Sequence, residues 1–232
     1  MKQGVFGFSL VELLVVIAII ALLLGILIPS LNKARSAAMQ VKCSHNLKQI
    51  DLVIHMYMSG NDDSYPCAQD PLPEGYWLWM GRGWRPFVEP YLTTNIDKDN
   101  PSVLLCPQDR ISREKFESTS YSYSMAFYHT PEQIGDINSP SGTYGASSPP
   151  CQPQRSSNVA KPAGKIIVGE WLSNHKRIDT DSGWWDWQGE RNYLFADGQV
   201  RLLEAEQIRQ AGDGYPNPNL TIGGIKGIDW PQ

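Results

Sequence analysis

Charge is scarce in this chain, and positive charge shows no excess. Only 19% of the 232 residues are Asp, Glu, Lys or Arg, against about 25% in an average protein. The 20 basic residues are outnumbered by 24 acidic ones, which gives a formal net charge of -4. Proteins that mainly hold nucleic acid carry a basic field for its phosphates. Nucleic-acid binding is therefore excluded as the main function.

Patterns that carry enzymatic chemistry are also missing. The histidines form no His-Glu-x-x-His zinc pattern, no Gly-x-Ser-x-Gly nucleophile turn occurs, and no glycine-rich phosphate loop precedes a helix. The four cysteines show no Cys-x-x-Cys spacing, so a zinc site is poorly supported. We therefore expect no catalytic residues, no metal and no cofactor, and we expect that the protein is not an enzyme.

Tryptophan is absent before residue 77, and aliphatic residues dominate the N-terminal part instead. Between Phe8 and Pro29 the single charged residue is Glu12. A helix of about 20 residues spans roughly 30 Å, the thickness of the hydrocarbon core of a bilayer. We therefore predict a transmembrane helix over residues 8–29. A carboxylate inside such a segment is a functional candidate by default.

A secretory signal peptide is the alternative for this segment, with Ala37-Ala38 as its cleavage site. The apolar run is longer than the roughly 7 to 15 residues of a signal core, and it contains Glu12. Apolar residues also keep a helical spacing beyond the run, at Leu31, Ala34, Ala38, Val41, Leu47, Ile50, Ile54 and Tyr57. We therefore expect one helix from Phe8 to about Met58, with residues 30–58 as an amphipathic continuation.

Pro29 lies inside this expected helix, and its ring clashes with the carbonyl of Gly25 four residues earlier. The pair predicts a kink or local melting over residues 25–29. A plain helix bend, or close helix packing at Gly25, is the alternative.

The residues Gly7-Phe8-Ser9-Leu10-Val11-Glu12, followed by an apolar helix, resemble the processing site of type IV pilins and type II secretion pseudopilins. The resemblance implies that a prepilin peptidase removes residues 1–7 as a leader, cutting after Gly7, and methylates the new amine of Phe8. It also implies that Glu12, with Gly25 and Pro29 in the same helix, serves assembly with other pilin subunits on an inner-membrane platform. Glu12 lies about 6 Å along the helix from Phe8, so a neighbour shifted by that rise brings its amine beside the carboxylate.

The basic residues around the span favour the opposite orientation. Lys2 stands alone before the span, whereas Lys33, Arg35 and Lys42 follow it, which by the positive-inside rule places the large domain in the cytoplasm. The processing site must face a cytoplasmic peptidase, and this requirement decides the orientation. We expect a single-pass protein of the bacterial inner membrane with its head in the periplasm or outside the cell.

Composition changes at Ser59, after which Pro, Gly, Ser and Trp recur. Short runs bounded by turn residues predict strands at Val103–Leu105, Tyr121–Phe127, Lys165–Gly169 and Tyr193–Leu203. The expected fold is α+β: a long N-terminal pilin-like helix packed on an antiparallel sheet in a head of residues 59–232, with extensive loops and a C-terminal loop region from about residue 204.

Asp197-Gly198 predicts a two-residue hairpin turn in which both residues take positive φ. In that turn Ala196 faces Gln199 and Phe195 faces Val200. The face expected to lie on the long helix then consists of Tyr193, Phe195, Val200 and Leu202.

Four segments of the chain occur in the order found in pseudopilin-like proteins of planctomycetes that are named for a His-x9-Asp-Gly motif. They are residues 43–50, 105–109, 162–170 and 192–200. Trp187 replaces the naming histidine, so the resemblance implies a folding role for Asp197-Gly198. Because Cys43 and Cys106 both lie in family motifs, the resemblance favours a disulfide between them. Cys67 and Cys151 are then paired or free, and four unpaired thiols are the alternative.

Tryptophans gather in two short segments, and their faces are common platforms for sugars or protein partners. The platform residues would be Trp77, Trp79, Trp184, Trp185 and Trp187. The alternative is a role in the core and in anchoring loops. Aspartates at 62, 63, 213 and 229 offer oxygen ligands for calcium, but without the spacing of a known calcium loop.

The favoured function is a pseudopilin or minor-pilin-like structural subunit of a type II secretion or type IV pilus-like filament. A membrane-tethered carbohydrate-binding module is the first alternative. A secreted hydrolase is the second, and it lacks a catalytic pair in the sequence.

Overall fold

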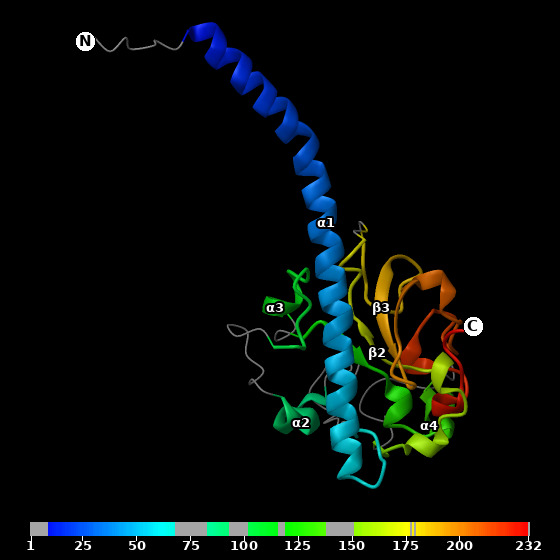
Figure 1. Cartoon of the computed structure of the whole chain (residues 1–232). Helices are drawn as coiled ribbons and strands as arrows, with labels where there is room; N and C mark the ends of the chain where they lie inside the picture. The colour runs from blue at the N-terminus through cyan, green and yellow to red at the C-terminus, as the bar shows by residue number, and fades with distance from the viewer. Residues whose placement is uncertain are drawn as a thin grey trace. The chain divides into compact units, whose positions relative to one another are not determined.

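The computed structural model describes residues 9–67, 83–92, 102–115, 119–137, 151–176, 178 and 180–231. A long N-terminal helix and a four-stranded antiparallel sheet dominate these residues, which confirms the expected α+β fold (Figure 1). The chain divides into two compact units, Met1–Gln40 and Val41–Gln232.

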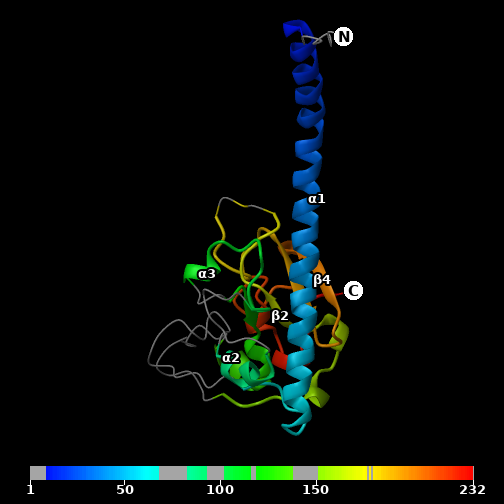
Figure 2. The ribbon, with the colours of Figure 1, turned by 60° about the vertical axis from the view of Figure 1, so that its left-hand side comes forward.

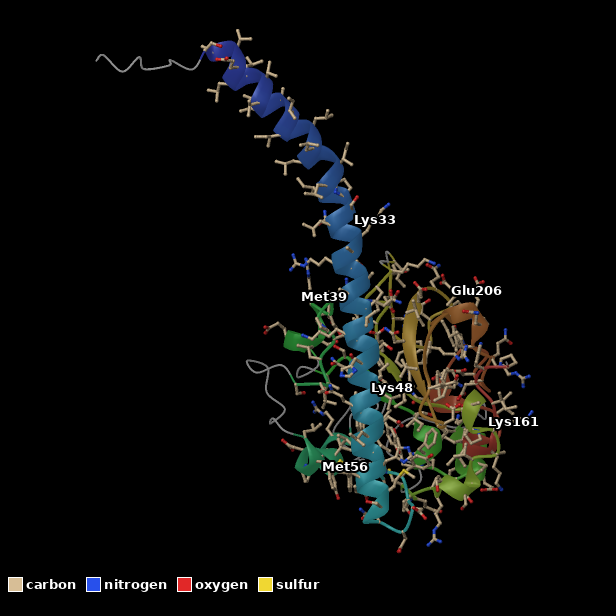
Figure 3. The ribbon with its side chains drawn as sticks, viewed as in Figure 1. Lys33, Met39, Lys48, Met56, Lys161 and Glu206 are labelled. Carbon is tan, nitrogen blue, oxygen red and sulfur yellow. A yellow bond between two sulfur atoms is a disulfide. The ribbon has the colours of Figure 1, made fainter. Side chains whose placement is uncertain are left out.

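Helix α1 runs over Leu10–Ser59 and belongs in part to each unit. In the first unit its aliphatic side chains are exposed, and before Lys33 the sticks in Figure 3 are almost all carbon. Residues 25–29 are helical throughout, so the local melting predicted around Pro29 does not occur in this chain. The Ser30 hydroxyl donates to the Ile26 carbonyl at 3.3 Å, one position after the proline.

In the second unit α1 runs alongside the rest of the head (Figure 2). It buries one stripe of side chains there. The stripe keeps the three-to-four spacing of a helical face, and its members are Cys43, Asn46, Leu47, Ile50, Val53, Ile54 and Met58. Leu31 and Val41 were expected on the same stripe but are 63% and 69% exposed. The buried stripe therefore begins at Cys43.

The sheet has the order β1-β2-β3-β4, and each neighbouring pair is antiparallel. The strands are β1 (Tyr121–Tyr123), β2 (Ile166–Glu170), β3 (Glu190–Phe195) and β4 (Val200–Glu204). The short α-helices are α2 (Arg85–Val88), α3 (Ser112–Lys115) and α4 (Pro131–Ile137). Three-residue 3-10 helices are η2 (Glu89–Tyr91), η3 (Met125–Phe127), η4 (Ser156–Asn158), η5 (Pro162–Gly164), η6 (Ala205–Gln207), η7 (Pro218–Leu220) and η8 (Gly224–Lys226).

Two of the expected strands differ in the structure. Val103–Leu105 forms turns, although Leu104 and Leu105 are buried. The expected strand Tyr121–Phe127 is divided into β1 and η3, because the Ser124 hydroxyl accepts a hydrogen bond from the Ala126 N–H and begins the 3-10 helix. The run of residues between turn residues therefore predicted too long a strand.

The hairpin between β3 and β4 is closed by three residues rather than two. The Gly198 N–H donates to the Phe195 carbonyl, and the Phe195 N–H donates to the Gln199 carbonyl, each at 2.9 Å. Gly198 has a φ of 80°, whereas Asp197 does not take a positive φ. This is a type I turn followed by a left-handed glycine. The prediction that Ala196 faces Gln199 is therefore wrong.

This turn shifts the register by one residue. Leu194, rather than Phe195, pairs with Val200, and a one-residue slip moves side chains to the other face of a sheet. Leu194 and Val200 pack in the core that contains α1, while Tyr193 and Phe195 pack in a second core on the opposite face. The prediction that Tyr193 and Phe195 lie on the helix is wrong, because both faces of β3 are buried.

We expect Gly198→Ala to destabilise the head more than Gly214→Ala does. Both glycines have a φ near 80°, where alanine costs about 1 to 2 kcal/mol. A Cβ at Gly198 would lie 2.9 Å from Asp51 Oδ2, whereas a Cβ at Gly214 would meet nothing within 4 Å. Gly198→Ala should therefore cost more, by up to roughly 1 kcal/mol, because the Asp51 carboxylate must move aside. Urea denaturation followed by tryptophan fluorescence measures both losses, and equal losses would contradict the contact with Asp51.

Candidate functional site

The first turn of α1 carries the single carboxylate of the apolar segment, and that carboxylate caps the helix. The Ser9 N–H donates to Glu12 Oε2 at 2.8 Å, and the Glu12 N–H donates to Ser9 Oγ at 3.2 Å. These reciprocal bonds form a capping box. Gly7 and Phe8, the residues of the predicted cleavage site, lie outside the described residues.

The apolar segment that follows is exposed along its length. From Leu10 to Ile28 its large aliphatic side chains are between 45% and 79% exposed. Among the described residues, one helix is long enough and apolar enough to cross a membrane, and this helix is α1. Its most apolar window has a mean hydropathy of 3.2. Water is an unfavourable environment for such a surface, so the segment suits a bilayer or the apolar faces of other helices.

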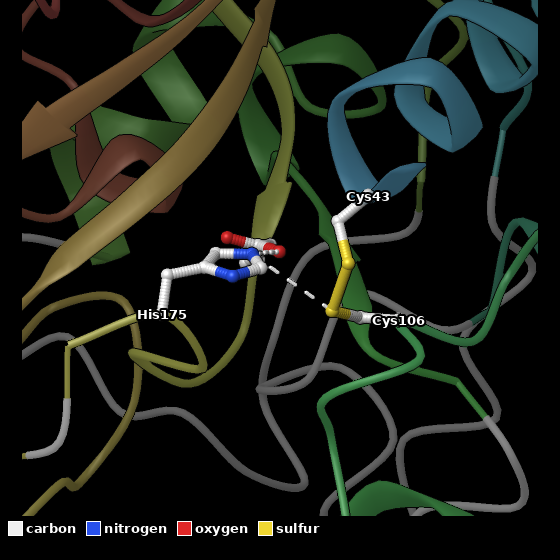
Figure 4. A group of neighbouring side chains, drawn as sticks. Cys43, Cys106 and His175 are labelled. Atoms are coloured by element: carbon white, nitrogen blue, oxygen red, sulfur yellow. Dashed lines mark hydrogen bonds and ion pairs between the residues drawn. A yellow bond between two sulfur atoms is a disulfide. The ribbon is translucent and has the colours of Figure 1, made fainter. Parts of the chain in front are cut away.

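A disulfide joins the second half of α1 to the head. Cys43 on α1 is bonded to Cys106, in the turn before α3, with their Cα atoms 5.2 Å apart (Figure 4). Both residues are fully buried. Close by, the Asn46 side chain donates to the Leu105 carbonyl at 3.1 Å, and the Tyr121 hydroxyl donates to the Cys43 carbonyl at 3.3 Å. The link therefore lies inside a packed, hydrogen-bonded junction.

Two ionisable side chains stand beside this disulfide. His175 Nε2 lies 2.8 Å from Glu170 Oε1 and 3.9 Å from Cys106 Sγ. The other ring nitrogen, Nδ1, contacts the side-chain oxygen of Gln108. The second oxygen of Glu170 accepts hydrogen bonds from the backbone N–H and side-chain amide of Asn192, at 2.8 and 3.1 Å. The carboxylate and the ring are thus held in fixed orientations.

The hairpin turn predicted at Asp197-Gly198 docks onto α1. Lys48 donates through its ammonium to the Gly198 carbonyl, and Asp197 accepts a hydrogen bond from the Gln199 N–H at 3.0 Å. Burial raises the pKa of the Asp51 carboxyl on the same helix; His55 and Lys48 partly offset this rise, and the nearby Asp197 carboxylate adds to it. The turn therefore fixes the sheet to the helix, in keeping with a folding role.

The tryptophans of the second aromatic segment do not form one surface platform. Trp184 is fully buried in the second core, so the prediction that it offers a face to a ligand is wrong. Trp185 is half-buried and packs edge-on against Trp171, with the ring centroids 4.6 Å apart. Trp187 is 36% exposed. The two remaining residues, Trp77 and Trp79, lie outside the described residues.

A buried ion pair ties the C-terminal segment to the sheet, and the sequence did not indicate it. The Lys165 ammonium lies 3.0 Å from Asp229 Oδ2, with side-chain exposures of 0% and 3%. Asp229 also accepts hydrogen bonds from the Ile166 N–H and the Thr221 hydroxyl. Asp229 is one of the aspartates that offer oxygen ligands for calcium, but in the structure its oxygens contact Lys165, Ile166 and Thr221.

Sequence reasoning also missed Glu170 and His175 as neighbours of the disulfide. Glu170 ends a strand that reads as apolar, and His175 follows in a turn. A buried charge at the end of an apolar strand was the available signal, since such charges need a partner. The partner lies in another segment, so only the fold identifies it.

Two family models match the chain. A model described as a prokaryotic N-terminal methylation motif matches residues 3–28. A model described as a protein of unknown function, DUF1559, matches residues 32–185, which is more than half of the chain. No curated protein and no solved structure matches the chain. The first match covers the apolar segment with its capped carboxylate, and the second covers the disulfide junction.

Proposed function

The chain belongs to the DUF1559 family and is a type IV pilin-like protein, and from this premise we propose that it is a pseudopilin or minor-pilin-like subunit of a membrane-anchored filament. In this proposal prepilin peptidase removes residues 1–7 and methylates the amine of Phe8. Residues 8–29 then anchor the chain in the bacterial inner membrane, with the head in the periplasm or outside the cell.

The observation that carries the proposal is the combination of a methylation motif with an exposed apolar helix that contains one carboxylate. An apolar helix of this length needs a bilayer before assembly and other apolar helices afterwards. The single carboxylate costs free energy in both places unless a cation lies beside it. The methylated amine of a neighbouring subunit supplies that cation.

The head supports a structural role. The disulfide junction, the docked hairpin and the buried Lys165–Asp229 pair all fix segments of the head to one another or to α1. Proteins that carry the methylation motif are structural subunits. The same filament architecture serves type II secretion and type IV pili, and we propose a subunit of one of these two systems.

We expect mass spectrometry of the protein from native membranes to find N-methylphenylalanine at position 8 as the first residue. The control is Gly7→Val, in which the leader should remain because the small residue before the cut is lost. A mature protein that begins at Met1, or near Ala38 as after signal-peptide cleavage, would overturn the proposal.

A further inference from the structure

Four metal-ligating side chains meet at the disulfide junction. The donor atoms of Cys43, Cys106, Glu170 and His175 all lie within 4.8 Å of one another. They come from α1, the turn before α3, strand β2 and the turn after β2 (Figure 4). Both cysteines and Glu170 are fully buried, and the His175 side chain is 3% exposed. Because they come from separate segments, their spacing in the sequence has no zinc-like pattern.

We propose that the protein with the Cys43–Cys106 disulfide reduced binds one Zn²⁺ through these four side chains. Two thiolates, one imidazole nitrogen and one carboxylate oxygen match the donor types and the number that zinc takes in tetrahedral sites. The site is independent of filament assembly, and it goes beyond the proposed function.

The surroundings are already arranged as a second layer of such a site. Gln108 contacts Nδ1 of His175, which leaves Nε2 directed at Glu170 and Cys106. Asn192 holds Oε2 of Glu170 and leaves Oε1 for the metal. Hydrogen bonds of this kind fix the orientation of metal ligands and raise their basicity. The two thiolates and the carboxylate would more than neutralise Zn²⁺, because their three negative charges exceed the two positive charges of the metal by one.

The disulfide and the metal exclude each other chemically. A dithiol or phosphine reductant gives two electrons to the S–S bond and is itself oxidised, and the two sulfurs take up two protons as thiols. Zn²⁺ then displaces both thiol protons and the proton that His175 Nε2 shares with Glu170, and these protons pass to the solvent. Each state holds Cys43 of α1 to Cys106 of the head, by a covalent bond or through the metal.

The test uses the full chain in detergent with Cys67→Ser and Cys151→Ser, so that only the junction thiols remain. After reduction with a phosphine under anaerobic conditions, Co²⁺ is titrated as a spectroscopic probe and then displaced by Zn²⁺. We expect the strong visible bands of tetrahedral thiolate-bound Co²⁺ at one ion per chain, and no bands in the oxidised protein. His175→Ala should weaken Co²⁺ binding and shift the bands, because water replaces the imidazole, and Gln108→Ala should weaken binding by about 10- to 100-fold.

His45→Ala is the matched control, because His45 is exposed on α1 two residues from Cys43, and it should change nothing. Absence of the bands in reduced protein that keeps its circular dichroism would overturn the proposal, as would unchanged affinity in His175→Ala or loss of binding in His45→Ala. If reduction unfolds the head, added Zn²⁺ should restore its circular dichroism, and failure to do so would overturn the proposal too.

Discussion

Replacing Asp229 with asparagine should destabilise the unit Val41–Gln232 by about 3 to 5 kcal/mol, because it leaves a buried ammonium without its counter-charge. Lys165 is fully buried, and its ammonium contacts the Asp229 carboxylate, the Thr221 hydroxyl at 2.5 Å and the Phe127 ring, whose centroid is 5.8 Å away. Asparagine keeps the shape of the side chain but removes its charge. The asparagine side chain also turns an N–H group towards one of the groups that now donate a hydrogen bond to the carboxylate.

The loss of stability caused by Asp229→Asn should become smaller as the pH rises. Burial lowers the pKa of Lys165 below its usual 10.5, while the Asp229 carboxylate raises it, so Asp229→Asn lowers this pKa further. When the folded state has the lower pKa, the unfolded chain binds more protons, and stability rises with pH up to about 10.5. The stability of the variant starts to rise at a lower pH than that of the wild type. The difference in stability between the two proteins therefore becomes smaller towards about pH 9.5.

The comparison of stabilities is limited to pH values up to about 9.5, because the buried tyrosines lower the stability at higher pH. Burial raises the pKa of Tyr193 to about 12, so the unfolded chain loses this proton first and stability falls at more alkaline pH. Urea denaturation of the full chain in detergent, at about pH 7 and about pH 9.5, gives the two free energies of unfolding.

Lys176→Met is the control for a charge change, because Lys176 forms an exposed pair with Glu204 at 2.7 Å, with side-chain exposures of 54% and 46%. Its removal should leave stability unchanged, since exposed ion pairs contribute little. The double variant Lys165→Met with Asp229→Asn should recover part of the loss, because no uncompensated charge remains. A loss of less than about 1 kcal/mol in Asp229→Asn, or one that does not change with pH, would contradict a buried charged pair.

The parts of the fold that the sequence predicted rest on local patterns. The helix up to Ser59 follows from hydrophobic spacing over many turns, and β2 follows from a run of apolar residues between turn residues. The hairpin was found from Asp197-Gly198, but its register was not. Two- and three-residue turns use the same residues, and only the packing on both faces of β3 decides between them.

The parts that the sequence did not predict depend on residues that are distant along the chain. Glu170 meets Asn192 across the sheet and His175 beside the disulfide, and Lys165 meets Asp229 at the far end of the chain. Each is a buried charge whose need for a partner is predictable. Which residue satisfies that need depends on the topology, and no periodic pattern encodes it.

Glu12 has two roles to separate, one inside its own helix and one between subunits. In the structure its carboxylate caps α1 together with Ser9, and a capping residue stabilises a helix without any neighbour. In the proposed filament the same carboxylate pairs with the methylated amine of the next subunit. The two roles need different properties, because a cap needs a side-chain acceptor and the pairing needs a negative charge.

Glu12→Gln should therefore reduce incorporation into filaments by at least about tenfold, since glutamine can still cap the helix but leaves the buried amine unpaired. Ser9→Ala is the matched control: it removes one bond of the capping box and keeps the charge, so incorporation should stay near the wild-type level. The measurement is the amount of this chain in sheared filaments, relative to the processed chain in the same membranes, which separates assembly from cleavage. Unchanged incorporation of Glu12→Gln, or an equally large loss in Ser9→Ala, would contradict the pairing between subunits, whereas loss in Glu12→Gln only would show that the charge acts between subunits.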